Sequence, residues 1–158
     1  LIHEKLYQSK DLTSIDFADY VKSLTIHLFS SFGIDVSIIK FIINIKSILL
    51  NINMAIPCGL IVNELITNSL KYAFPDNRKG EISINLKSEP CIETPERKIY
   101  SLIVSDNGIG LPANFDFENT ASFGLQLVNT LLQQLHANIE IDRKSGTSFK
   151  IVFKELQL

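Results

Sequence analysis

Apolar residues recur along this chain with two periods, one typical of helices and the other typical of strands. Between residues 15 and 32 they recur every three or four positions, which predicts an amphipathic helix that ends at Gly33. Thr13 or Ser14 is expected to cap the start of that helix. The β-branched run at residues 36–45 then predicts a strand.

The rest of the pattern predicts two more helices and four more strands. After a turn or cap at residues 51–53, a second helix is expected to carry Pro57 near its first turn and to stop at Pro75. The other predicted elements, in chain order, are a strand at 81–87, an exposed loop at 88–98, a strand at 99–105, a long connection at 107–122, a helix at 124–135 and two antiparallel strands at 138–142 and 147–153. Strands and helices do not alternate strictly. The expected fold class is therefore α+β, a two-layer sandwich in which about three helices cover one face of a mixed sheet of about five strands.

Composition narrows the possible partners. The chain has 158 residues, of which 46% are hydrophobic, enough for one domain with a real core. Its net charge is −2, so it lacks the basic footprint of a nucleic-acid-binding domain. The longest apolar run, near residues 41–50, is interrupted by polar residues and is too short to span a membrane. We therefore expect no contact of this domain with nucleic acid or with a membrane.

Two further features concern the protein's surroundings. Cys58 and Cys91 have neither metal-binding nor redox spacing, and we expect both to be reduced thiols in a cytoplasmic domain. The chain begins without methionine and without a signal peptide, so we expect a piece of a longer protein.

The helix predicted before Pro75 carries the first candidate for chemistry. At about 100° per residue, Glu64, Asn68 and Lys71 fall within roughly 60° of one another on one face. Another face is mostly apolar and consists of Ile61, Val62, Leu65, Ile66, Ser69 and Ala73. A carboxylate, a carboxamide and an ammonium are thus presented together, although an ordinary amphipathic helix with a solvated face has the same pattern.

Three glycine-containing motifs follow in the second half of the chain. An apolar strand runs into Asp106 and a turn with Gly108 and Gly110, which by itself is also ordinary turn chemistry. Gly124 then opens a leucine-rich helix, and Gly146 precedes Thr147 at the start of the last strand. Each motif alone is weak, but their fixed order is specific.

Together these motifs resemble the catalytic, ATP-binding domain of sensor histidine kinases. Residues 63–71 resemble the N box, 106–110 the first glycine box, Gly124 the second, and 146–147 the last. The resemblance extends over about residues 14–154. It also links the chain to the wider superfamily of gyrase, heat-shock chaperone, histidine kinase and mismatch-repair ATPases, and implies their Bergerat-type ATP-binding fold.

The second glycine box departs from the commonest pattern of the family. Most members have Gly-x-Gly-Leu, whereas this chain has Ser122 where the first glycine would stand, before Gly124 and Leu125. That is the pattern of a subfamily with Ser-x-Gly-Leu-Gln-Leu-Val. The lid, residues 111–122, is short, has no clear Phe-box motif, and is expected to be the most mobile internal segment without nucleotide.

The resemblance implies a role for each motif. Asp106 would accept a hydrogen bond from the adenine amino group, and Asn68 would be the protein's Mg²⁺ ligand. Glu64 would be catalytic, either polarising the attacking nucleophile or holding a water on the metal. The other implied ATP-binding residues are Lys71, Tyr72, Gly108, Gly110, Leu111, Ser122, Gly124, Leu125 and Thr147. For Lys71, Tyr72 and Thr147, ordinary surface, half-buried or strand positions remain the alternative.

The expected activity is transfer of the γ-phosphoryl group of ATP to a histidine. Residues 1–13 would be the end of a dimerisation and phosphoacceptor hairpin, and residues 14–158 the catalytic domain. His3 is not the expected acceptor, because in the resembling subfamily His-Glu-Lys-Leu-Tyr lies near the end of the second hairpin helix. The acceptor would lie upstream, so residues 1–158 alone are not expected to autophosphorylate.

The resemblance also implies partners for the full-length protein. It would be a homodimer and would pass the phosphoryl group to the receiver domain of a response regulator. The alternative is a nucleotide-binding switch, or an anti-sigma-type serine kinase module of the same fold.

Overall fold

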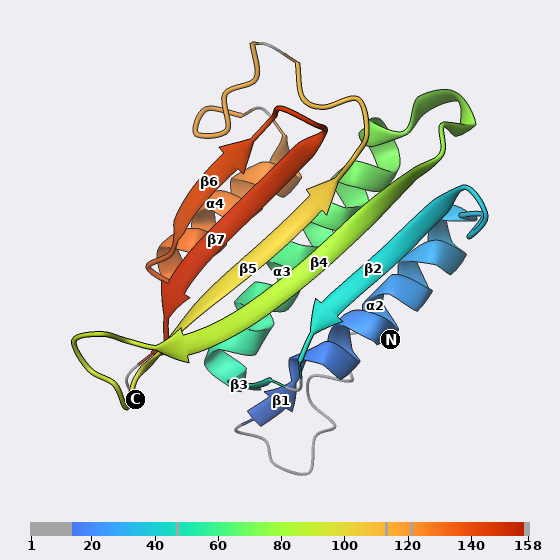
Figure 1. Ribbon diagram of the computed structural model, residues 1–158. Helices are drawn as coiled ribbons and strands as arrows, with labels where there is room; N and C mark the ends of the chain where they lie inside the picture. The colour runs from blue at the N-terminus through green and yellow to red at the C-terminus, as the bar shows by residue number, and fades with distance from the viewer. Residues whose placement is uncertain (1–13, 47, 113, 121, 157–158) are drawn as a thin grey trace.

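The protein forms a two-layer α+β sandwich, as predicted (Figure 1). The structure is a computed structural model that describes residues 14–46, 48–112, 114–120 and 122–156. One layer is a five-stranded sheet in the order β2-β4-β5-β7-β6, and the helices cover one of its faces. The hairpin end predicted at residues 1–13 lies outside the described residues.

The five predicted strands all occur in this sheet. They are β2 (Ile39–Ile45), β4 (Gly80–Pro90), β5 (Lys98–Asp106), β6 (Asn138–Asp142) and β7 (Thr147–Lys154). Only β2 and β4 pair in parallel, while the other neighbours are antiparallel, so the sheet is mixed as expected. A small second sheet, β1 (Ser14–Asp16) with β3 (Leu49–Asn51), was not predicted, because three residues are too few to display a strand period.

The first helix, α2 (Phe17–Phe32), begins later than its pattern suggested. Its cap is Asp16, whose Oδ1 accepts a hydrogen bond from the Asp19 amide at 3.2 Å. The prediction of Ser14 as the cap was wrong, because Ser14 pairs in β1, and Thr13 lies outside the described residues. Gly33 ends the helix in the left-handed conformation, at φ 60°, as predicted.

The second helix, α3 (Ile52–Asn68), begins where it was predicted and differs from its prediction at its end. Asn51 caps it, within the predicted cap region, and Pro57 lies in the second turn, near the first as expected. The α-helix stops at Asn68 and continues as a π-helical turn, η1 (Ser69–Ala73), and a short 3-10 turn, η2 (Pro75–Asn77). Single π turns are rare and are frequently found at functional sites.

The core lies between the sheet and the three helices, of which the last is α4 (Phe123–Gln134). The apolar face predicted for α3 is buried at every position, namely Ile61, Val62, Leu65, Ile66, Ser69 and Ala73. Each fully buried Ile or Leu contributes roughly 1.5–3 kcal/mol relative to its exposed state. This burial fixes the rotation of α3 and thereby the direction in which its polar face points. Cys58 and Cys91 are both free and buried.

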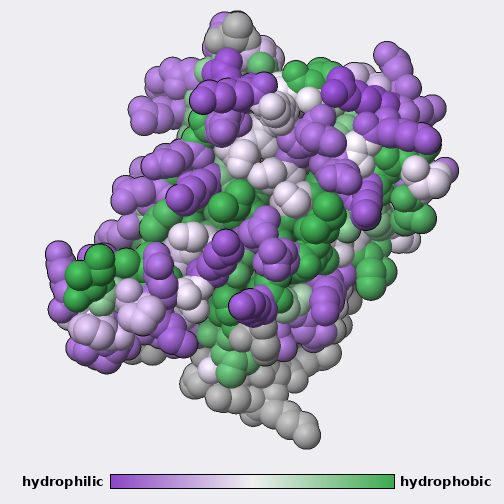
Figure 2. Space-filling model, viewed as in Figure 1, coloured by the Kyte–Doolittle hydropathy of each residue, from purple (hydrophilic) through white to green (hydrophobic). Residues whose placement is uncertain are grey.

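The other face of the sheet carries no helix from the described part of the chain. Figure 2 shows this face, where hydrophilic residues mingle with hydrophobic ones. Ser83, Ser105 and Ser148 stand in register across its three middle strands, and the hydroxyls of Ser105 and Ser148 are 2.8 Å apart.

Candidate functional site

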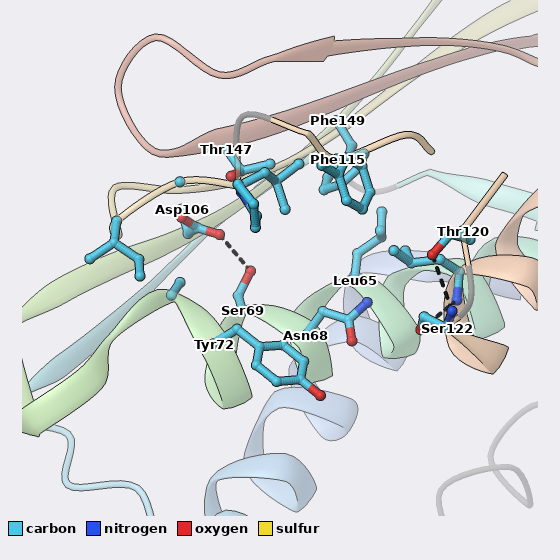
Figure 3. Close-up of a pocket in the computed structure, with 16 residues that line it drawn as sticks. Leu65, Asn68, Ser69, Tyr72, Asp106, Phe115, Thr120, Ser122, Thr147 and Phe149 are labelled. Atoms are coloured by element: carbon cyan, nitrogen blue, oxygen red, sulfur yellow. Dashed lines mark hydrogen bonds between the residues drawn. The ribbon is translucent and has the colours of Figure 1, made fainter. Parts of the chain in front are cut away.

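A cavity of about 630 Å³ opens beside the π turn that follows α3. Its walls come from α3 and η1, the ends of β5 and β7 that lie together, the connection after β5, and the start of α4. The predicted residues that line it are Asn68, Tyr72, Asp106, Gly110, Leu111, Ser122, Leu125 and Thr147. Figure 3 shows Asp106 and Thr147 at one end, Thr120 and Ser122 at the other, and Asn68 between them.

Asp106 is the buried acidic group of the cavity. It is the last residue of β5 and is 9% exposed. Its Oδ2 accepts a hydrogen bond from the Ser69 hydroxyl at 2.8 Å (Figure 3). Its Oδ1 accepts one from the Gly108 amide at 3.0 Å. A carboxylate offers about four acceptor positions, so two donors leave capacity for a donor on a ligand.

Ser69 was missed as a site residue by the sequence analysis, which placed it on the apolar face of the helix. It is the first residue of the π turn and is 8% exposed. The available signal was a hydroxyl one residue after Asn68 on an otherwise apolar stripe. That signal does not reveal the partner, because Asp106 is 37 residues away in the sequence.

Thr147 lies directly across from Asp106 in the sheet. The two residues are partners in the β5–β7 register, and Thr147 is 5% exposed. Gly146, just before it, has φ +85°, and a Cβ added there would overlap the carbonyl oxygen of Asp106. The last glycine motif therefore lets the β6–β7 turn pack directly on the backbone of Asp106.

Substituting Gly146 by alanine is expected to destabilise the fold by about 3 kcal/mol, of which left-handed strain accounts for roughly 1–2 kcal/mol. The remainder comes from the backbone shift that the overlap with Asp106 forces. Gly33→Ala is the matched control, because Gly33 also has positive φ but nothing lies within 4 Å of an added Cβ. Urea unfolding of both variants measures the difference, and equal losses would contradict the packing argument.

Asn68 and Glu64 lie one turn apart on the half-buried face of α3. Asn68 lines the cavity, whereas Glu64 does not. The Glu64 carboxylate instead lies against the first turn of α4, so close that a Cβ on Gly124 would overlap its Oε2. Gly124 of the second glycine box thus leaves room for the carboxylate of Glu64, which belongs to the segment that resembles the N box.

Lys71 and Tyr72 lie in the π turn and are both exposed. Tyr72 lines the mouth of the cavity and is 68% exposed, while Lys71 does not line it. The predicted alignment of Lys71 with Glu64 and Asn68 assumed α-helical geometry up to Pro75. Because the π turn winds more slowly than an α-helix, residues beyond Asn68 are rotated relative to that expectation.

The connection between β5 and α4 packs more closely than its sequence indicated. Phe117 is buried at 7% exposure, and its ring lies 6.1 Å from that of Phe149. Its carbonyl accepts a hydrogen bond from Asn129 at 2.9 Å, and that of Pro112 accepts one from Arg143 at 2.9 Å. The burial of Phe117 was not predicted, because this segment has little hydrophobic pattern of its own. Its mobility stays a prediction.

The first turn of α4 closes the far end of the cavity. Ser122 caps the helix, and its Oγ accepts a hydrogen bond from the Leu125 amide at 3.4 Å. Ser122 and Leu125 both line the cavity. The amides and dipole at a helix start favour anionic groups such as phosphate.

The remaining predicted residue, Gly108, is buried and does not line the cavity, but its amide donates to Asp106 and it packs against Ala73 of the cavity wall. Residues 14–46, 48–112, 114–120 and 122–156 contain no cluster of three or more His, Cys, Asp or Glu able to hold a metal. Among the described residues that line the cavity, Asn68 offers a carboxamide oxygen and Asp106 a carboxylate, both of which are ligand types for hard cations. Within the same ranges, no helix has the length and apolar character needed to cross a membrane.

Two family profiles match the chain. Residues 55–157 match the family described as "Histidine kinase-, DNA gyrase B-, and HSP90-like ATPase". Residues 1–32 match a profile described as "Histidine kinase". The second match includes residues 1–13 and continues through α2.

Curated relatives are similar over part of the chain. A blue-light-activated histidine kinase 2 from Erythrobacter litoralis is 31% identical over 85 residues, which are 54% of this chain and 23% of that protein. The sensor histidine kinase PdtaS of Mycobacterium tuberculosis is 33% identical over 73 residues, 46% of this chain and 13% of that protein. The chain thus spans less than a quarter of the length of these relatives. Their names support the histidine kinase prediction over the switch or serine kinase alternative.

Solved structures agree over nearly the whole chain. The Erythrobacter litoralis EL346 blue-light-activated histidine kinase superposes with a TM-score of 0.81 at 25% identity, covering 96% of this chain and 46% of that one. The mycobacterial sensor histidine kinase MprB has the same fold, with a TM-score of 0.66 at 16% identity, covering 92% of this chain and 98% of that one.

Proposed function

The chain belongs to the family of histidine kinase-, DNA gyrase B- and HSP90-like ATPases, and on that premise we propose that it is the catalytic domain of a sensor histidine kinase. It binds ATP with Mg²⁺ and transfers the γ-phosphoryl group to a histidine on a helix elsewhere in its longer protein. The observation that carries the proposal is the position of the buried Asp106 carboxylate opposite the first turn of α4.

Adenine binds at the Asp106 end of the cavity. Its exocyclic amine donates to Asp106, whose position is held by the Ser69 hydroxyl and the Gly108 amide. Thr147 lies beside Asp106 and supports the same end, directly or through water. The apolar side chains of Leu65 and Phe149, which line the same cavity, supply surface for the ring.

The triphosphate extends toward Asn68 and the first turn of α4. Asn68 offers an amide oxygen, which is the ligand type that Mg²⁺ takes, together with phosphate oxygens and waters. The bound cation supplies charge neutralisation. Ser122 and the amides at the start of α4 hold phosphate oxygens, and Lys71 adds a positive charge from the rim. Tyr72 packs beside the ribose or the phosphates at the cavity mouth.

Substituting Asn68 by alanine is expected to weaken ADP binding about tenfold in Mg²⁺ and much less in EDTA. The reason is that the amide oxygen would contribute only to the part of ADP binding that depends on the cation. Isothermal titration calorimetry in the two buffers measures both affinities. Asn53→Ala is the control, since Asn53 is exposed at the start of the same helix. Equal losses in Mg²⁺ and EDTA would argue against Asn68 as the ligand.

The acceptor helix docks at the mouth of the cavity. Phe123 is 88% exposed and Leu127, one turn later on α4, is 38% exposed, so they form an apolar strip beside Ser122. A helix seated there brings its histidine in line with the γ-phosphorus. Transfer then depends mainly on positioning and on charge neutralisation.

The partners proposed for the full-length protein follow from this chemistry. The phosphohistidine passes its phosphoryl group to an aspartate of a response regulator receiver domain. We propose that the full-length protein is a homodimer and that this domain lies in the cytoplasm.

The proposal is tested by supplying the acceptor. Residues 1–158 alone, incubated with γ-labelled ATP, should bind nucleotide without becoming labelled. Adding the upstream region of the longer protein should give acid-labile label on a histidine in that region. Acid-labile label on His3 of residues 1–158 alone would overturn the acceptor assignment, and acid-stable label on serine would favour a serine kinase.

A further inference from the structure

The strand β6 forms one margin of the five-stranded sheet (Figure 1). It pairs with β7 on one side, and no other strand from the described part of the chain pairs with its outer side. Alternate residues of β6 therefore direct backbone N–H and C=O groups away from the sheet. Such a margin is a template for an added strand, and charged side chains on it discourage strands that carry charges of the same sign.

A groove runs beside β6 on the face of the sheet that the helices cover. One hollow, of about 560 Å³, lies between the loop residues 114–118 and β6, and a second, of about 570 Å³, lies between β6 and α4. The two hollows share Glu118 and Ile139, so they are continuous. We define the β6 groove by its apolar residues Phe117, Leu132, Ile139 and Ile141 and its acidic residues Asp116 and Glu118.

The charge around the groove is acidic. Asp116 and Glu118 are exposed along it, and Glu140 and Asp142 are exposed on the strand itself. Hydrogen bonds from Asn119 and from the Glu118 amide lower the pKa of Asp116. Within the described ranges, no lysine or arginine lines either hollow.

Basic residues on β7 and in the β6–β7 turn, beside the groove, have other neighbours. Lys150 lies on β7 opposite Glu140, and Arg143 donates a hydrogen bond to the Pro112 carbonyl at 2.9 Å. Lys144 follows Asp142 in the turn, and its amide donates to the Asp142 carboxylate. A ligand that carries its own positive charges would therefore complement the groove.

We propose that the β6 groove binds an extended, basic segment of a partner protein, which adds to β6 as a sixth strand. Backbone hydrogen bonds to the free margin of β6 supply affinity that does not depend on sequence. Alternate apolar side chains of the segment enter the groove over Ile139 and Ile141. The intervening lysine or arginine side chains meet Glu140 and Asp142, which point to the opposite face.

A second copy of this chain is a poor occupant of the same groove. Antiparallel pairing of β6 with another β6 about Glu140 would place Glu140 opposite its own copy. Antiparallel pairing centred on Ile141 instead would place Glu140 opposite Asp142 of the other copy. Like charges directly opposite one another destabilise a sheet, so the margin disfavours self-association while it favours a basic strand.

The groove is connected to the cavity described above. Phe115 lines both the larger cavity and the loop side of the groove. A strand bound in the groove would hold the loop residues 114–118 from their outer side. Nucleotide affinity should consequently change when the groove is filled.

The probe for this test is an acetylated, amidated heptapeptide of alternating lysine and valine, added to the ¹⁵N-labelled 158-residue chain. We expect amide shifts concentrated on residues 116–118 and 137–142. The double variant Glu118→Lys, Glu140→Lys should bind it at least tenfold more weakly. Glu89→Lys, which replaces an exposed carboxylate on β4 away from the groove, should bind as the parent does.

Four further results test the proposal. A peptide of alternating glutamate and valine that bound equally well would remove the charge argument. A lysine–valine peptide N-methylated at alternate residues lacks the N–H groups needed to pair with β6. Equal binding of that peptide would show that the segment does not add as a strand. Shifts on β2, the opposite margin, in place of β6 would overturn the assignment of the site. Saturating peptide should change the dissociation constant of ADP at least threefold, and an unchanged value would remove the connection through Phe115.

Discussion

Asp106→Asn is expected to weaken ADP binding about 100-fold while leaving the fold intact. The amide oxygen can still accept from the Gly108 amide, and the amide nitrogen can donate to the Ser69 hydroxyl, which is able to accept. The adenine amine then meets an N–H group where it needs an acceptor. A lost charged hydrogen bond costs about 1.5–3 kcal/mol, and each 1.4 kcal/mol is a tenfold change in affinity.

A second ligand makes this prediction more specific. Inosine diphosphate carries a carbonyl in place of the adenine amine, so the parent protein should discriminate against it and Asp106→Asn should discriminate less or prefer it. Calorimetry with both nucleotides measures this change. Asp142→Asn, at an exposed strand end, is the control for the loss of one negative charge. An unchanged affinity for ADP in Asp106→Asn would refute the adenine assignment.

The fold could be predicted from the sequence because its elements have long, regular patterns. The alternation of β4 and the period of α4 each extend over enough residues to reveal the type of element. The buried face of α3 was predicted residue by residue, since burial follows the helical period directly. The short strands β1 and β3 were missed because three residues are too few to display a strand period.

The candidate site was less predictable, because it depends on contacts between distant segments and on irregular backbone. The Ser69–Asp106 hydrogen bond joins residues 37 positions apart, and no local pattern encodes it. Lys71 and Tyr72 lie in the π turn, so the α-helical spacing of about 100° per residue does not give their directions. The second glycine box looked like a departure from the family because Ser122 stands in place of its first glycine. In the structure Ser122 caps α4, and the glycine that is kept, Gly124, is the position where the carboxylate of Glu64 approaches the helix.

The proximity of Glu64 to α4 leads to the prediction with the largest expected effect on chemistry. Glu64→Gln should lower the rate of phosphoryl transfer to the acceptor histidine about 100-fold, because a positioned general base typically contributes 10²–10⁴-fold. The glutamine keeps the shape and the hydrogen-bonding reach of the side chain but does not take a proton. Glu64 does not line the cavity, so the dissociation constant of ADP should stay within about twofold of the parent value. Single-turnover transfer and calorimetry measure the two quantities separately.

Two comparisons separate the roles of Glu64. If the Glu64 carboxylate polarises the nucleophile, the Mg²⁺ concentration for half-maximal transfer should be the same in Glu64→Gln and in the parent. If it holds a water on the cation, that Mg²⁺ concentration should be higher in Glu64→Gln. Gly124→Ala should reproduce the slow transfer with glutamate still present, because the added Cβ occupies the place of Oε2 and displaces the carboxylate. Glu81→Gln, at an exposed carboxylate on β4, should transfer at the parent rate. Parent-like transfer in Glu64→Gln would exclude the carboxylate from the chemistry, and the contact between α3 and α4 would then serve packing alone.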